Sequence, residues 1–154
     1  MKFNIYFIGL ALVFTITVTG CSNEGTTIEK PPRFEIDLQS EGMFIIVQQR
    51  IGDANEYGDF KEIIIDEQIQ TIKEILNDTI WEAIQVEMSQ PPHYKFSFIN
   101  KGSDEEIETF LIWVTPNKDR LEVVRDKGGY AKLTKANSYR LFEISTGNKL
   151  SASQ

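Results

Sequence analysis

The residues around Cys21 form a pattern that predicts covalent modification of its thiol. Cys21 is the only cysteine, and it ends the run Val18-Thr19-Gly20-Cys21 after an apolar N-terminal segment. The pattern matches a bacterial lipobox, in which the cysteine thiol receives a diacylglyceryl group and becomes the first residue of the mature protein. The sequence therefore predicts lipid attachment at Cys21.

Residues 1–20 have the organisation of a secretory signal. Lys2 supplies a positive start, and residues 5–18 form an apolar stretch close to the roughly 7–15 residues of a signal h-region. A membrane-spanning helix would need about 20 apolar residues. We expect cleavage before Cys21 and a protein anchored on the extracytoplasmic face of the cell membrane. The alternative is an uncleaved N-terminal anchor, which also places the domain outside the cytoplasm.

Composition narrows the possible partners. The formal net charge of the chain is −7, which argues against nucleic acid, because nucleic-acid binding needs basic patches. Attachment to the membrane is therefore expected through the lipid on Cys21, whose two acyl chains bind stably where one would bind only marginally. No second cysteine is left for a disulfide, so the fold must rest on a hydrophobic core.

The usual catalytic constellations are missing from the sequence. His93 is the only histidine and lies between Pro92 and Tyr94 at the start of a predicted strand. No nucleophile motif such as G-x-S-x-G accompanies it, so a triad is not indicated. The acidic cluster at 103–106 falls in a predicted turn and is expected to be solvated. We therefore predict no enzyme activity, no metal and no cofactor.

Residues 53–59 open like a calcium-binding loop. Asp53, Asn55 and Gly58 fill its first, third and sixth positions, but the twelfth is Ile64, where a bidentate glutamate is required. A solvated connection is the favoured interpretation, and an irregular calcium site is the alternative.

Aromatic residues gather in the second half of the chain. They are Tyr94, Phe96, Phe98, Phe110, Trp113 and Tyr130. Aromatic stripes in strands are usually core, and we expect this for most of them. Tyr94 and Trp113 lie near strand ends, where an aromatic side chain can face a cleft or a partner. These two residues are the candidate interaction residues.

Hydrophobic periodicity predicts an α+β fold. In the first half, patterns rich in Phe, Ile and Val predict strands at 34–38, 42–51, 60–65 and 80–88. Between the last two, Ile69, Ile72, Ile75 and Leu76 share one face of a helix over 66–77, with Asp66 as its N-cap.

Turn residues divide the second half into a meander. Strands are predicted at 94–99, 106–114, 120–125 and 130–133. A helix over 135–146 follows, with Thr134 as cap and Gly147 as stop. Short turns imply antiparallel pairing, and both helices should cover one face of the sheet. The chain thus consists of a signal peptide, a lipidated tether, one domain and a polar tail, at 1–20, 21–32, 33–147 and 148–154.

Three short strings resemble the YhfM-like domain of small lipoproteins from Gram-positive bacteria. They are Pro92-His93-Tyr94 leading into Phe96 and Phe98, Phe110-Leu111-Ile112-Trp113, and Leu133-Thr134 before the last helix. The resemblance covers the whole mature domain. It implies a cell-surface lipoprotein and supplies no catalytic residues.

Together these observations predict a non-enzymatic, membrane-anchored binding module. Its partner would be an envelope protein or another envelope component, and an exposed strand edge could take a partner segment by β-addition. The alternative is a carrier of a small ligand or metal that uses the sheet face or residues 53–59.

Overall fold

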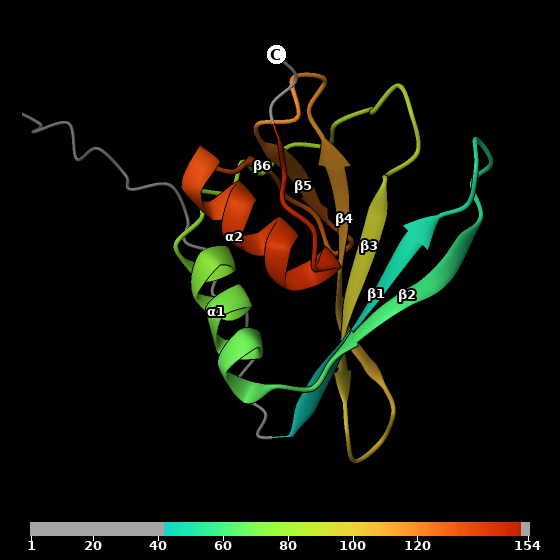
Figure 1. Cartoon of the computed structure of the whole chain (residues 1–154), viewed down its shortest axis with the longest axis vertical. Helices are drawn as coiled ribbons and strands as arrows, with labels where there is room; N and C mark the ends of the chain where they lie inside the picture. Colours follow the sequence, from blue (N-terminus) through green and yellow to red (C-terminus); the bar gives the residue numbers. More distant parts are fainter. Residues whose placement is uncertain (1–41, 152–154) are drawn as a thin grey trace, which may run out of the picture.

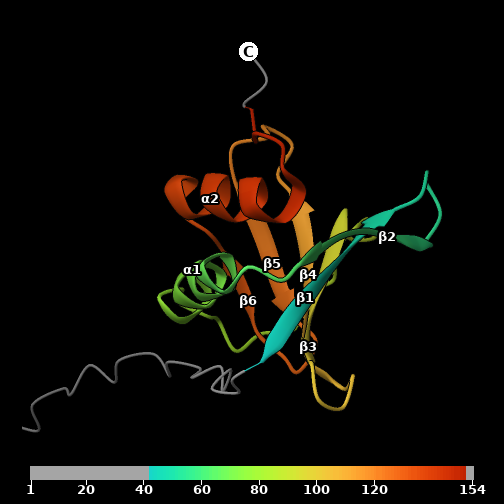
Figure 2. The ribbon, with the colours of Figure 1, turned by 60° about the horizontal axis from the view of Figure 1, so that its bottom comes forward.

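The computed structural model describes residues 42–151, which form a six-stranded antiparallel sheet with two helices on one face (Figure 1; Figure 2). The strands are β1 (Met43–Arg50), β2 (Tyr57–Ile63), β3 (Tyr94–Asn100), β4 (Glu106–Val114), β5 (Leu121–Arg125) and β6 (Tyr130–Lys132). The helices are α1 (Asp66–Asn77) and α2 (Lys135–Thr146). The predicted α+β fold is confirmed, with both helix ranges.

The strand order is β2-β1-β3-β4-β5-β6, and every neighbouring pair is antiparallel. Strands β3 to β6 follow each other in sequence and in space, which confirms the predicted meander. Only the step from β2 to β3 is long, and it contains α1. This crossover places β1 in the interior of the sheet, with β2 at one edge and β6 at the other.

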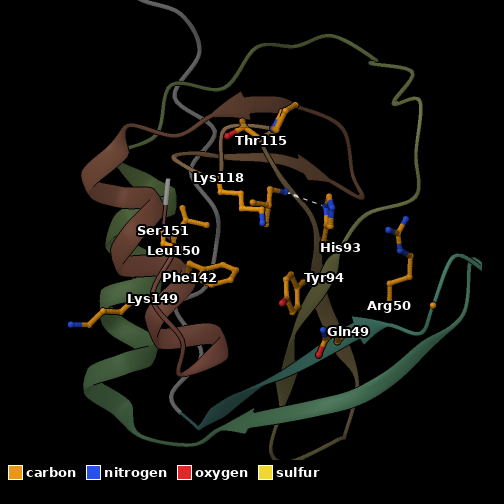
Figure 3. Close-up of a pocket in the computed structure, with 13 residues that line it drawn as sticks. Gln49, Arg50, His93, Tyr94, Thr115, Lys118, Phe142, Lys149, Leu150 and Ser151 are labelled. Atoms are coloured by element: carbon orange, nitrogen blue, oxygen red, sulfur yellow. Dashed lines mark hydrogen bonds between the residues drawn. The ribbon is translucent and has the colours of Figure 1, made fainter. Parts of the chain in front are cut away.

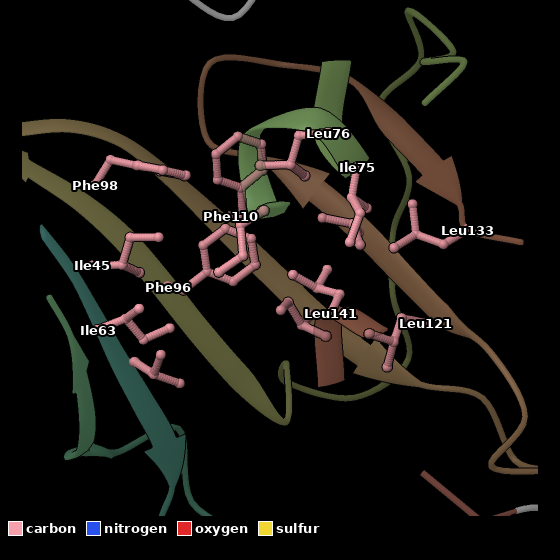
Figure 4. Close-up of a cluster of buried hydrophobic side chains, with 14 of the residues drawn as sticks. Ile45, Ile63, Ile75, Leu76, Phe96, Phe98, Phe110, Leu121, Leu133 and Leu141 are labelled. Carbon is pink, nitrogen blue, oxygen red and sulfur yellow. The ribbon is translucent and has the colours of Figure 1, made fainter. Parts of the chain in front are cut away.

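The core lies between the sheet and the two helices (Figure 4). Alternation along the strands directs one set of side chains to this face, and Phe110 lies at its centre. Its ring stacks on Phe96 with centroids 5.0 Å apart, and the rings of Phe98 and Trp81 each lie 5.9 Å away. Each buried phenylalanine contributes roughly 1.5–3 kcal/mol through burial, so this cluster holds the sheet against α1.

The two helices begin differently. Thr134 accepts a hydrogen bond from the backbone N–H of Asn137 at 3.2 Å, and Gly147 ends α2 with φ of 75°, as predicted. The prediction that Asp66 caps α1 is wrong. Asp66 is the first helical residue, Ile65 takes the cap position in extended conformation, and no side chain caps α1. The carboxylate of Asp66 can still favour the positive end of the helix.

The strand predicted at 80–88 is not present. Only Glu82 pairs, through two backbone hydrogen bonds with Tyr130 of β6 at 2.8 and 3.0 Å. Trp81, just before it, is buried in the core and donates its indole N–H to the carbonyl of Leu76 at 3.0 Å. The chain then leaves the edge of the sheet, so the ladder cannot continue.

The described domain extends past α2. Leu150 is only 6% exposed and belongs to the hydrophobic core, so the segment predicted as a polar tail packs against the domain at Leu150. The predicted strand at 34–38, the signal, Cys21 and the tether lie outside the described residues. Within residues 42–151, neither helix is long and apolar enough to cross a membrane.

Candidate functional site

A pocket of about 460 Å³ opens at one end of the sheet, beside α2 (Figure 3). Its walls come from the end of β1, the start of β3, the end of β4 with the turn after it, and the end of α2 with the residues that follow. We call this cavity the α2 pocket. Small-molecule sites in proteins typically have volumes of roughly 300–1,000 Å³, so the pocket has the size of a ligand site.

Backbone hydrogen bonds fix the strand ends around the α2 pocket. The N–H of Arg50 donates to the carbonyl of His93 at 3.0 Å, and the N–H of His93 donates to Ile112 at 2.8 Å. His93 therefore sits between β1 and β4, one residue before β3 begins. In the β1–β3 ladder the next pair is Gln49 opposite Tyr94. The positions of these pocket residues are thus set by the sheet.

Aromatic rings form the apolar wall of the α2 pocket. Tyr94 is half-buried, and its ring meets that of Phe142 edge-on with centroids 5.8 Å apart. On its other side Phe60 contributes a second edge contact at 6.1 Å. Burial raises the pKa of the Tyr94 phenol, so it remains a neutral hydrogen-bonding group at neutral pH. Tyr94, a predicted interaction residue, thus lines a cleft.

His93 lines the pocket, and one of its two ring nitrogens is already engaged. Its Nδ1 accepts a hydrogen bond from the backbone N–H of Val114 at 3.2 Å, so in the neutral ring the proton is on Nε2. Burial lowers the pKa of His93, and the positive charge of Arg50 lowers it further. We therefore assign His93 as a neutral imidazole at pH 7 with Nε2–H as a donor.

Cationic side chains line the α2 pocket as well. Arg50 donates from Nη1 to the carbonyl of Pro91 at 3.0 Å, which holds the guanidinium in place. Lys118 lies in the turn after β4, in a left-handed conformation with φ of 52°. Lys149 also lines the pocket, although its side chain points away in Figure 3. No acidic residue is among the described residues that line it.

Trp113, the other candidate interaction residue, faces the opposite side of the sheet from Phe110 and Ile112. Its side chain is 8% exposed, and its indole N–H donates to the carbonyl of Gln90 at 2.7 Å. The adjoining prolines are held in the same way, because Tyr57 donates to the carbonyl of Pro92 at 2.9 Å. Trp113 is therefore largely buried on the outer face of the sheet.

A second accessible surface follows the edge of the sheet at β2. In the part of the chain that the structure describes, no strand pairs with the outer side of β2. Phe60 on β2 and Ile64 and Ile65 directly after it have large exposed fractions of 41%, 59% and 55%. Asp59 and Glu62 are exposed on the same strand. The edge is thus apolar with acidic residues beside it.

The predicted calcium-like loop forms the connection between β1 and β2. The backbone N–H of Ile51 donates to the carbonyl of Glu56 at 2.9 Å, which closes the loop as a hairpin, and residues 53–56 are exposed. Across residues 42–151, no group of three or more His, Cys, Asp or Glu side chains comes close enough to hold a metal ion.

Comparison with known proteins gives no relative: no family model, no curated protein and no solved structure matches the chain. The resemblance to the YhfM-like domain therefore stays a prediction.

Proposed function

We propose that the chain is a lipid-anchored, extracytoplasmic binding protein that holds a small ligand in the α2 pocket and does not transform it. The observation that carries the proposal is the pocket itself. It combines a volume in the range of small-molecule sites with an aromatic wall and convergent polar groups.

The location outside the cytoplasm rests on the lipobox around Cys21 and on the resemblance to the YhfM-like lipoproteins. Residues 22–41 connect that cysteine to β1. Fully extended at about 3.5 Å per residue, they reach no farther than roughly 70 Å. A lipid on Cys21 would thus keep the α2 pocket in the layer next to the membrane.

The state of His93 supports binding without chemistry. A general base must accept a proton from the reacting group within hydrogen-bond reach. The Nδ1 atom of His93 is engaged by the Val114 N–H, and Nε2 carries the ring proton. The one histidine in the pocket is therefore prepared to donate a hydrogen bond.

Filling the α2 pocket should abolish ligand binding. Gln49 is exposed and lines the pocket, so Gln49→Trp should occupy the cavity and change the free energy of unfolding by only about 0.5 kcal/mol. A fragment library screened by ligand-observed NMR should give hits on the natural protein that Gln49→Trp no longer binds.

Gln48→Trp is the matched control. Gln48 is the neighbouring residue, points to the opposite face of the sheet and makes only an exposed hydrogen bond, to Asp59 at 3.0 Å. This variant should keep the hits. Equal binding by Gln49→Trp and the natural protein would show that the α2 pocket is not the ligand site.

The edge at β2 favours a second candidate function, the capture of an extended protein segment by β-addition. The acidic residues beside the edge indicate that such a segment would be basic. Ile64→Lys should then eliminate a partner crosslinked in cells, because it adds a repulsive charge to the edge. Ile80→Lys is the control, since Ile80 is 74% exposed and outside β2. A partner retained by both variants would exclude this edge.

A further inference from the structure

We propose that the ligand of the α2 pocket is an amphipathic organic anion. Its acid group would be held by Arg50, Lys118 and the Nε2–H of His93, and its apolar body would lie against Tyr94, Phe142 and Leu150. This inference rests on the proposed function and names the chemical class of the ligand.

The charge of the pocket differs from that of the whole molecule. The chain has 23 acidic and 16 basic residues, yet Arg50 and Lys118 line one cavity that no described acidic residue lines. Lys149 also lines it, with its side chain directed away. In an acidic protein such a place attracts anions selectively, because the walls of a cleft concentrate the field of the charges that line it.

The donors in the pocket suit an acid group. The guanidinium of Arg50 has five N–H donors, and its bond to the carbonyl of Pro91 uses one of them. That bond also fixes the guanidinium, so less conformational entropy is lost when an anion binds. His93 adds a neutral donor at Nε2, because Nδ1 is engaged by Val114. Carboxylates and phosphates accept hydrogen bonds and donate none when ionised.

The rest of the wall suits an apolar body. Figure 3 shows the rings of Tyr94 and Phe142 beside each other, with Lys118 and His93 beyond them on one side. Leu150 closes the pocket next to Phe142 and is itself part of the core. An inorganic ion would satisfy the cations and leave this wall in water. A carboxylic acid or phosphate ester with an aromatic or branched aliphatic body would cover both.

The test uses the full chain, purified from membranes in a nonionic detergent, and four probes. These are 3-phenylpropanoate, its neutral amide 3-phenylpropanamide, phenyl phosphate and inorganic phosphate. His93 is the only histidine, so the imidazole NMR signals of the protein come from this one residue in the pocket, and its Hε1 signal is followed. An organic anion should shift this signal with a Kd about tenfold lower than that of the amide, as expected for a charged hydrogen-bonding group. The two anions distinguish a carboxylate ligand from a phosphate ester.

Three results would overturn the inference in different ways. Equal binding of 3-phenylpropanoate and its amide would exclude an anion requirement and leave the small-ligand function standing. No shift with any organic probe would contradict the proposed function together with the inference. A response to inorganic phosphate as strong as that to phenyl phosphate would show that the apolar wall has no role.

A charge variant provides an independent check. Lys118→Asn removes one cation and keeps a residue that tolerates the left-handed conformation of this turn. It should weaken binding of the organic anion several-fold and leave binding of the amide unchanged. Lys101→Asn is the control, because Lys101 is an exposed turn residue that does not line the pocket. Equal weakening by both variants, or none by Lys118→Asn, would contradict the assignment of Lys118.

Discussion

Replacing Cys21 by alanine is expected to move essentially all of the protein from the membrane fraction of the cell to the soluble extracytoplasmic fraction. The physical reason is that alanine has no thiol to receive the diacylglyceryl group, and two acyl chains are what makes such an anchor stable. Membrane fractionation followed by immunoblotting measures the redistribution. The intact mass should show the loss of residues 1–20 in both proteins and the added lipid in the natural chain only.

Ser22→Ala is the control for this experiment, because it changes the next residue and leaves the thiol in place. It should remain in the membrane fraction. The outcome that contradicts lipidation is a Cys21→Ala protein that also stays in the membrane. If the mass of the natural chain still includes residues 1–20, the segment is an uncleaved anchor, which is the alternative to lipid attachment.

Loss of the lipid on Cys21 should change where the α2 pocket is located in the cell and leave its affinity for ligand unchanged. A soluble Cys21→Ala protein should bind the probes of the pocket as the natural protein does, since the substitution leaves unchanged all the described side chains that line the pocket. The variant loses only its attachment to the membrane. The anchor confines the pocket to the neighbourhood of the membrane, so a defect of this variant in cells with unchanged affinity in solution would mean that location is part of the function.

The helices and strands that the sequence predicted well are those in which the regularly spaced apolar residues are also the buried ones. In β3, Phe96 and Phe98 are buried on the core face and alternate with polar residues, so the period of two is visible in the amino acids. In α1 the isoleucines repeat at helical spacing and are buried in the same way. Each pattern is local, and a local pattern can be recognised without knowing which segments will be neighbours.

The failure at 80–88 shows the limit of the same argument. The apolar residues Ile80, Ile84, Val86 and Met88 alternate along the chain, with Glu82 as the exception. Yet the first two are exposed and the last two are only half-buried. Val86 and Met88 line a shallow depression beside Leu111 on the outer face of the sheet. They gain burial by packing on strands that are already paired. Alternation of apolar residues therefore does not by itself specify backbone pairing.

The α2 pocket was harder to predict because its residues come from distant segments. The pairing of β1 with β3 and of β3 with β4, together with the position of α2 on the sheet, is what brings together Arg50, Lys118 and Phe142. The sequence signal was limited to Tyr94, whose place at a strand end indicated a cleft. His93 next to it was noted as an isolated residue, and nothing local indicated the cations.

Replacing Trp113 by alanine is expected to lower the free energy of unfolding by about 3–5 kcal/mol, the range for large aromatic residues removed from a packed site. The side chain is 8% exposed, and its indole N–H satisfies the carbonyl of Gln90. The substitution would remove both the packing and the hydrogen bond that holds residues 89–92 against the sheet. Urea denaturation, followed by circular dichroism, measures the change.

Tyr139→Ala is the matched control, since Tyr139 is an aromatic residue of α2 with 36% of its side chain exposed. It should cost about 1 kcal/mol or less. The comparison decides between the two roles that the position of Trp113 near a strand end allows. A loss of stability for Trp113→Ala as small as that for Tyr139→Ala would mean that the indole contributes little to packing. Its role as a contact for a partner would then become the better explanation.

A loss in the expected range means that Trp113 holds the prolines before β3 in place, and these prolines lead directly into His93 and Tyr94. Trp113 on the outer face of the sheet would thus help to position His93 and Tyr94 in the α2 pocket. We therefore expect Trp113→Ala to weaken ligand binding as well, although Trp113 does not line the pocket.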